Sequence, residues 1–263
     1  MTDAWRIEPA ADDDRAYAAL AADSIWNAYS IGDLAPPFRA YARVALAERG
    51  GATAACLLLR HPRFNCVIPA GDPDGMAALL GAVELPESAF ALVRPEHRAA
   101  FATVYAFVRP PQAMVRMALA PADFHPTPGW ERVATRLTPA HLGDLAALYA
   151  SYAESAFTAD MLDVGPAWGV WAAGALVAAA GTHAHAPQYG VAVIGNVYTL
   201  PDQRGHGYAS AASSAVVADL LARGCRLLAL NVAAANAPAR AIYARLGFRD
   251  HCAYVEGTAR LKG

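Results

Sequence analysis

The sequence predicts an α/β protein with a mixed sheet, helices on both of its faces, and a division into two domains. Stretches typical of strands and helices alternate through the second half in the order strand, helix, strand, helix, strand, which is typical of such a sheet. The first half also mixes the two element types, with no repeat at the period of a solenoid. A proline-rich segment separates the halves and marks the domain boundary.

That segment, Pro121–Trp130, holds three prolines and one glycine in ten residues. Neither a helix nor a strand can continue through such a composition. We therefore expect one domain over residues 1–125 and a second over residues 126–263. A chain of 263 residues is long enough for two domains that each bury a core.

The composition argues against several classes of function. The 21 Lys and Arg residues against 23 Asp and Glu give a formal charge of −2, so no net field favours nucleic acid or an anionic membrane. The four cysteines lie far apart without a Cys-x-x-Cys pair, which argues against a zinc site or a disulfide framework. The N-terminus lacks a signal-peptide core, and the most apolar run, residues 168–181, is shorter than a membrane span. We expect a cytoplasmic protein with no metal and with neither nucleic acid nor a membrane as partner.

In the first half, acids, glycines and prolines set the limits of the expected elements. Acidic residues at 12–14 begin a helix at the end that its dipole favours, and Glu-Arg-Gly-Gly at 48–51 joins two strands in a hairpin. In chain order we expect helix 15–22, strands 39–46, 52–60 and 64–70, helix 72–80, strand 89–93, helix 95–101, and strands 104–109 and 113–119.

The second half has clearer helix limits. Thr138 and Pro139 are a typical N-cap and first helical residue, while Gly224 and Gly247 end the two later helices. In chain order we expect strand 131–136, a helix from 139, strands 169–172, 176–186 and 190–200, a helix to about 223, strand 227–232, a helix from 236, and strands 248–252 and 254–260.

The stretch Asn196–Ala209 carries the strongest functional pattern. An apolar strand runs through a Pro-Asp turn into a turn with Gly205 and Gly207, and a helix follows. Glycines let successive backbone N–H groups converge on one anion, and the positive end of the helix dipole points at the same place. Arg204 adds a cation. The pattern predicts a site that holds a diphosphate.

Two other phosphate sites fit this stretch poorly. A dinucleotide-binding turn places its glycines directly after the strand, whereas residues 200–204 intervene here. A Walker loop ends in Gly-Lys-Ser/Thr, which the chain lacks here. A tight turn without any ligand stays open as the structural alternative.

Two signatures resemble the GNAT superfamily of N-acyltransferases. The sequence Arg-Gly-His-Gly-Tyr-Ala at 204–209 fits the superfamily motif Arg/Gln-x-x-Gly-x-Gly/Ala. The run Leu230–Phe248, with an Asn-capped helix that carries a tyrosine and ends in Leu-Gly-Phe, resembles the second signature. The resemblance covers the chain from about Trp130 to the C-terminus.

The first half resembles a degenerate GNAT-like repeat, as in tandem-domain relatives such as glycine N-acyltransferases. Its order of strands and helices fits, but it lacks the Arg-x-x-Gly-x-Gly/Ala turn. A structural lid is the alternative for this half. The resemblance therefore implies a GNAT fold, with two tandem GNAT-like domains.

The resemblance also implies acetyl-CoA, or another acyl-CoA, as co-substrate. The strand that ends at Leu200 and the strand 227–232 would separate. Pantetheine would bind between them to the backbone near Val197, Tyr198 and Thr199. A strand N–H near Val197 would stabilise the oxyanion that forms at the thioester. The residues expected to hold the pyrophosphate are Arg204, Gly205, His206, Gly207, Tyr208, Ala209 and Ser210. Asn236 would contact the coenzyme as well as cap its helix.

An amine acceptor would attack the thioester directly in a ternary complex. The leaving thiol has a pKa of about 8.5, so an O–H donor assists its departure. Tyr243 matches the superfamily's tyrosine acid. The general base is not identified, because residues 190–195 contain no acid. His183 and Glu154 are candidates. The alternatives are a water molecule that relays the proton and an amine that binds in its neutral form.

The expected function is therefore acetyl or acyl transfer to an amine of a small metabolite, peptide or protein. The missing strand acid motivates an alternative, a catalytically silent protein that binds coenzyme A or acyl-CoA as a sensor or regulator. A purely structural domain is a weaker alternative. The sequence does not identify the acceptor, because acceptors contact variable loops.

Overall fold

The computed structural model describes residues 4–152, 159 and 161–263, and these form two compact units. Unit 1 consists of the chain to Arg116 with residues 233–235 and 251–263, and unit 2 of residues 117–232 and 236–250. The division differs from a single boundary after residue 125, because the last strand returns to unit 1. There β13 (Arg249–Leu261) pairs with β5 (Ser88–Val93) through Val255–Arg260.

The sheet of unit 1 has the order β1-β2-β3-β4-β5-β13, and β6 also pairs with β13. Neighbours are antiparallel except β4 and β5, which pair in parallel through Cys66 and Val67. The remaining strand bounds are β1 Arg6–Glu8, β2 Ala42–Arg49, β3 Ala52–His61, β4 Phe64–Gly71, β6 Tyr105–Phe107 and, running on into unit 2, β7 Gln112–Leu119. The sheet is mixed, as the sequence predicts.

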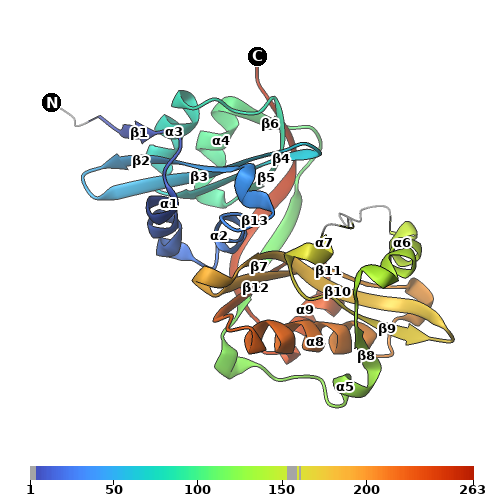
Figure 1. The fold of residues 1–263 in the computed structure, drawn as a ribbon. Helices are drawn as coiled ribbons and strands as arrows, with labels where there is room; N and C mark the ends of the chain where they lie inside the picture. The colour runs from blue at the N-terminus through green and yellow to red at the C-terminus, as the bar shows by residue number, and fades with distance from the viewer. Residues whose placement is uncertain (1–3, 153–158, 160) are drawn as a thin grey trace. The chain divides into compact units, whose positions relative to one another are not determined.

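Helices α3 and α4 lie on one face of the sheet of unit 1, and α1 and α2 lie on the other (Figure 1). Apolar side chains of α3 and α4, including Met76, Leu79 and Phe101, form the core with the sheet. The helix bounds are α1 Asp13–Leu20, α2 Ala28–Gly32, α3 Pro73–Ala82 and α4 Arg98–Val104. The sequence did not predict α2, which is short and ends in glycine.

The sheet of unit 2 has the order β12-β11-β10-β9-β8. Strands β11 and β12 are parallel and the other neighbours antiparallel, so this sheet is mixed as well. The strand bounds are β8 Ala134–Arg136, β9 Trp168–Ala172, β10 Ala175–Ala186, β11 Val191–Thr199 and β12 Leu227–Ala233.

Helices cover both faces of this sheet, with α8 on one face and α6 and α7 on the other (Figure 1). Leu145, Leu148 and Tyr149 of α6 pack against β10 and β11. The helix bounds are α5 Trp130–Val133, α6 Leu142–Ala150, α7 Met161–Val164, α8 Tyr208–Ala222 and α9 Ala237–Arg245. Among the described residues no helix is long and apolar enough to cross a membrane.

Two element predictions are wrong in detail. Residues 131–133 belong to the helical turn α5 rather than to a strand, because Gly129 turns the chain with a φ of 76° and Trp130 packs edge-on against Trp168. The two strands expected at 248–252 and 254–260 form the single strand β13. All four cysteines are free.

Candidate functional site

The parallel strands β11 and β12 separate within unit 2. They pair from Val191 and Leu227 to Ile194 and Leu230, and no pair follows. Beyond that point β11 continues to Thr199 and β12 to Ala233. The two strands therefore present polar backbone groups to the space between them, as the resemblance implies.

A β-bulge lies where the strands begin to separate. Between the pairs Ala179–Tyr198 and Gly181–Gly195, the two β11 residues Asn196 and Val197 stand opposite Ala180 alone. Asn196 has a φ of 53°, and its carbonyl oxygen accepts a hydrogen bond from the Tyr149 hydroxyl. A bulge leaves its extra residue out of the ladder. Val197 therefore has no Cα partner in β10 or in β12.

Two buried polar atoms on the separated strands lack a hydrogen-bond partner among the described residues, Thr199 Oγ1 and Asn231 Oδ1. Leaving such an atom buried and unsatisfied costs about 1–3 kcal/mol. Polar atoms of this kind therefore mark places where a ligand's N–H groups would be stabilised. The sequence analysis missed Asn231, although it is the one polar residue in the apolar strand sequence Leu-Leu-Ala-Leu-Asn-Val at 227–232.

The glycine-rich turn leads into α8 with an open N-terminus. Gly205 and Gly207 have φ values of 85° and 79°, which favour glycine, and nothing lies within 4 Å of a Cβ built at either position. Gly207 is the N-cap of α8 and supplies no capping side chain. The N-termini of α1, α3 and α9, by contrast, are capped by their own Asp12, Asp72 and Asn236.

The backbone amides at the start of α8 are consequently available. The first backbone hydrogen bond at this end runs from Ala211 N to Gly207 O at 3.0 Å. In the described part of the chain, no acceptor is found for the amides of Tyr208, Ala209 and Ser210. Free amides and the helix dipole together make a site for an anion.

The side chains around this turn make different contacts. Arg204 and His206 are exposed; Arg204 Nε donates to Thr199 O at 3.4 Å, and the His206 ring stacks on Tyr208 with centroids 5.5 Å apart. The Ser210 hydroxyl lies 2.6 Å from Thr127 Oγ1. The hydroxyl of Ser210 therefore links α8 to the segment before α5. Its backbone amide remains available to bind an anion.

Tyr243 lies in the interior beside the end of α9. Its side chain is 7% exposed, and its ring packs edge-on against Phe248 with centroids 6.1 Å apart. Burial raises the pKa of the Tyr243 phenol, so it stays protonated at neutral pH and can serve as a proton donor. The helix begins as predicted, because Asn236 Oδ1 accepts from Ala239 N at 3.1 Å.

Gly247 fixes the end of α9. Its φ is 102°, and a Cβ at this position would lie 1.8 Å from Asp123 O, so only glycine fits. Arg240 on the same helix forms an ion pair with Asp250 at 2.5 Å. Its guanidinium is thus engaged within unit 2.

His183 packs across the base of the separating strands. A Cβ at Gly195 of β11 would lie 2.9 Å from His183 Nδ1, so the ring occupies the space that a side chain there would need. Burial lowers the pKa of His183 to about 4, which keeps the imidazole neutral near pH 7. His185 is held elsewhere, with Nε2 3.5 Å from Cys225 Sγ. Glu154 lies outside the described residues.

The corresponding turn of unit 1 is closed. The first turn of α3 follows β4 as that of α8 follows β11, but Asp72 Oδ1 accepts from Gly75 N at 2.9 Å. A Cβ at Gly75 would lie 2.8 Å from the Trp5 ring, so an indole covers this turn. The side chains of unit 1 therefore fill the place that α8 leaves open in unit 2.

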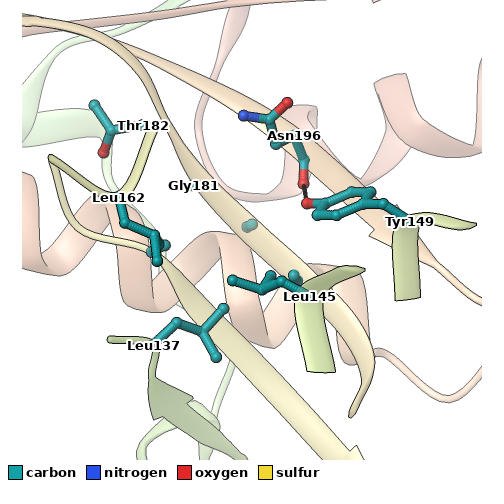
Figure 2. Close-up of a pocket in the computed structure, with 10 residues that line it drawn as sticks. Leu137, Leu145, Tyr149, Leu162, Gly181, Thr182 and Asn196 are labelled. Carbon is teal, nitrogen blue, oxygen red and sulfur yellow. Dashed lines mark hydrogen bonds between the residues drawn. The ribbon is translucent and has the colours of Figure 1, made fainter. Parts of the chain in front are cut away.

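A pocket lies beside the bulge of β11 (Figure 2). Its apolar walls come from β10 and from the segments of α6 and α7, and Asn196 and Tyr149 meet at its edge. In the described residues no group of three or more His, Cys, Asp or Glu side chains could hold a metal ion.

A family model matches most of the second half of the chain. Residues 132–248 match the model of the Acetyltransferase (GNAT) family. No curated protein matches the chain. The matched residues include the bulge, the open turn before α8 and Tyr243.

Solved structures share the fold over the whole chain. A Drosophila melanogaster protein is 15% identical over 99% of each chain, with a TM-score of 0.69. A GCN5-related N-acetyltransferase from Sphaerobacter thermophilus is 19% identical, over 99% of this chain and 97% of that one, with a TM-score of 0.55. A tandem GNAT protein from the clavulanic acid biosynthesis pathway is 17% identical over 99% of each chain, with a TM-score of 0.54. The chain thus has the fold of a tandem GNAT protein, as its first half suggests.

Proposed function

We propose that this chain is an N-acyltransferase that transfers the acetyl group of acetyl-CoA to an amine, because residues 132–248 match the model of the Acetyltransferase (GNAT) family. The observation that carries the proposal is the open N-terminus of α8, which has Gly207 where three other helices have capping side chains. It follows the strand that separates from its parallel neighbour, with residues 200–206 between them.

The pyrophosphate of the coenzyme binds at this turn. Its charge is matched by the amides from Gly205 to Ser210, by the helix dipole and by the guanidinium of Arg204. The pantetheine arm lies between β11 and β12, with Val197, Tyr198 and Thr199 on one strand and Asn231 on the other. Its amide N–H groups give Thr199 Oγ1 and Asn231 Oδ1 the donors that they lack.

The thioester carbonyl lies at the bulge, where the Val197 N–H stabilises the oxyanion. The amine nitrogen forms a bond to the acyl carbon, the carbon–sulfur bond breaks, and the sulfur takes the proton of the Tyr243 hydroxyl. The amine loses one proton to a base. Burial keeps Tyr243 protonated until that moment, which suits it for the role of acid.

His183 is the base that we favour. It is neutral at pH 7, and its ring covers Gly195 at the position on β11 where a side-chain acid is absent. A water molecule between the imidazole and the amine can relay the proton if the two groups are not in direct contact. Glu154 and an amine that arrives neutral are the alternatives. The acceptor is an amine of a small metabolite, a peptide or a protein.

A catalytically silent acyl-CoA sensor is the second candidate function. The observation in its favour is the absence of any carboxylate from Gly190–Gly195, where a base would adjoin the thioester. A sensor binds acyl-CoA at the same open turn but releases no thiol with any amine. Thiol release across a panel of amines therefore separates the two functions.

Thermal unfolding with acetyl-CoA tests coenzyme binding, which both candidate functions require. Ligand at about 100 times its dissociation constant adds roughly 2.7 kcal/mol to the free energy of unfolding if only the native state binds. We expect the melting temperature of the full chain to rise accordingly. An unchanged melting temperature with acetyl-CoA and with longer acyl-CoAs would refute coenzyme binding altogether.

A further inference from the structure

The hydroxyl of Tyr149 meets the backbone at the bulge of β11. It donates a hydrogen bond to the carbonyl oxygen of Asn196, which Figure 2 shows as a dashed line. The carbon of that carbonyl is bonded to the nitrogen of Val197. The hydrogen bond is therefore made to the same peptide group whose N–H is the proposed contact of the thioester oxyanion. The transfer as described so far gives Tyr149 no role.

The peptide group between Asn196 and Val197 carries a direction from one side to the other. This peptide bond is trans, so its C=O and its N–H lie in one plane and point in opposite directions. A donor on α6 that holds the carbonyl therefore directs the Val197 N–H away from α6. Asn196 has a φ of 53°, a conformation that persists in a non-glycine residue only where the surroundings support it. The Tyr149 hydroxyl supplies such support.

A hydrogen bond at the carbonyl also makes the N–H a stronger donor. The C–N bond has partial double-bond character, so electron density drawn toward the oxygen leaves the nitrogen and its hydrogen more positive. Hydrogen bonds linked through a polar group in this way strengthen one another by roughly 10–30%. Burial raises the pKa of the Tyr149 phenol, so the hydroxyl keeps its proton at neutral pH and acts as the donor.

Packing between α6 and β11 holds the Tyr149 ring in place. The side chain is buried in the core of unit 2 with leucines of the same helix. Its ring centroid lies 6.1 Å from that of Tyr198 on β11, and the Tyr152 ring stacks on Tyr198 at 4.9 Å. Ser151 Oγ lies 3.0 Å from the Tyr198 hydroxyl. The end of α6 is thus fixed to the strand that carries the bulge, which preorganises the hydroxyl.

We propose that Tyr149 is a positioning residue for acyl transfer, whose hydroxyl orients and polarises the Val197 N–H through the carbonyl of Asn196. The inference rests on the proposed function, because it needs the thioester at the bulge. Tyr149 acts through the peptide group and gives up no proton in the reaction. Its hydroxyl therefore contributes to the rate of transfer rather than to the affinity for the coenzyme.

The thioester carbonyl of bound acetyl-CoA reports on this N–H without any acceptor. We would bind acetyl-CoA labelled with carbon-13 at the carbonyl to the full chain and record the C=O stretch by isotope-edited infrared difference spectroscopy. A stronger donor weakens the carbonyl bond and lowers its frequency. We expect the band at a lower frequency in the native chain than in Tyr149→Phe. Calorimetry should show the same affinity of both proteins for free coenzyme A, which has no such carbonyl.

Thiol release with amines should fall in Tyr149→Phe by roughly 2- to 8-fold, which is 10–30% on a logarithmic scale of the roughly 10²–10³-fold effect of removing a whole oxyanion donor. Tyr105→Phe is the matched control. Tyr105 is buried in unit 1, and its hydroxyl donates to Pro86 O at 2.6 Å. The control therefore loses the same kind of hydrogen bond without touching the bulge, and we expect the carbonyl band and the rate of the native chain.

A second substitution strengthens the hydrogen bond instead of removing it. A tyrosine fluorinated next to its hydroxyl, placed at position 149, keeps the ring and the O–H group but is a stronger donor. We expect its carbonyl band to lie below that of the native chain and thiol release to rise. Because this variant retains the hydroxyl, it serves as the test if Tyr149→Phe does not fold.

Two results would overturn the inference while coenzyme binding stays intact. One is a carbonyl band that neither the loss of the Tyr149 hydroxyl nor its fluorination moves. The other is an equal change of the band in Tyr105→Phe, because the shift would then follow from lost stability. Failure of coenzyme A and acetyl-CoA to bind the native chain would instead refute the proposed function.

Discussion

Replacing Gly207 with aspartate tests whether the open helix end is the coenzyme site. An Asp at this N-cap would place a carboxylate at the start of α8, where unit 1 has the carboxylate of Asp72 at the start of α3. Gly207 has a φ of 79°, and nothing lies within 4 Å of an added Cβ, so the new side chain meets backbone strain but no clash. Asp tolerates this left-handed region better than most residues. The carboxylate would compete with the pyrophosphate for the same amides.

The size of the effect follows from Coulomb's law. At an effective dielectric constant of about 20 and a separation of about 6 Å, two unit charges of like sign repel by about 2.8 kcal/mol. That corresponds to a loss of roughly 100-fold in affinity for acetyl-CoA. The asparagine variant, Gly207→Asn, has the same shape without the charge, so it should lose much less. Salt should reduce the difference between the two variants.

Calorimetry with acetyl-CoA on both variants provides the measurement. Gly224→Asp is the control, because Gly224 also has positive φ, at 86°, with open space around it, but lies at the other end of α8. We expect Gly224→Asp to bind as the native chain does. Equal affinity of Gly207→Asp and Gly207→Asn would show that no phosphate lies at this helix end.

Two further predictions concern the proton transfers. Tyr243→Phe should lower thiol release by roughly 10²–10⁴-fold while the melting-temperature shift with acetyl-CoA persists; an unchanged rate would show that Tyr243 is not the acid. His183→Gln should lower thiol release and lessen the loss of stability on acidification. The lowered pKa of His183, about 4, means that the unfolded chain binds its proton first, so stability falls as pH drops from about 6.5 toward 4. Equal pH profiles of melting temperature would contradict the burial of His183.

The parts of the site that are local in sequence were predictable. Gly205 and Gly207 have positive φ, which glycine adopts most easily, so the turn before α8 could be recognised from the chain alone. The cap of α9 also followed from local chemistry, because Asn236 bonds an amide three residues away. Each of these predictions needed only neighbours within one helical turn.

The parts that depend on distant pairing were not predictable. The bulge at Asn196 is a matter of register between β10 and β11, and the engagement of Ser210 depends on Thr127, far away in the sequence. Long-range pairing also assigns residues 251–263 to unit 1, although the sequence reads as a continuous second half. Local propensity carries no information about which strand lies beside which.

The two units share an architecture but differ at the first turn of the helix that follows the strand. Each unit has a strand, a helix and a parallel strand in succession, β4-α3-β5 and β11-α8-β12. In unit 1 the carboxylate of Asp72 occupies an amide at the start of α3, and the Trp5 ring covers the same turn. An anion would have to displace both, and it would face the charge of the acid. We therefore expect one acetyl-CoA per chain in the same titration. A stoichiometry of two would mean that α3 exchanges its own cap for a phosphate.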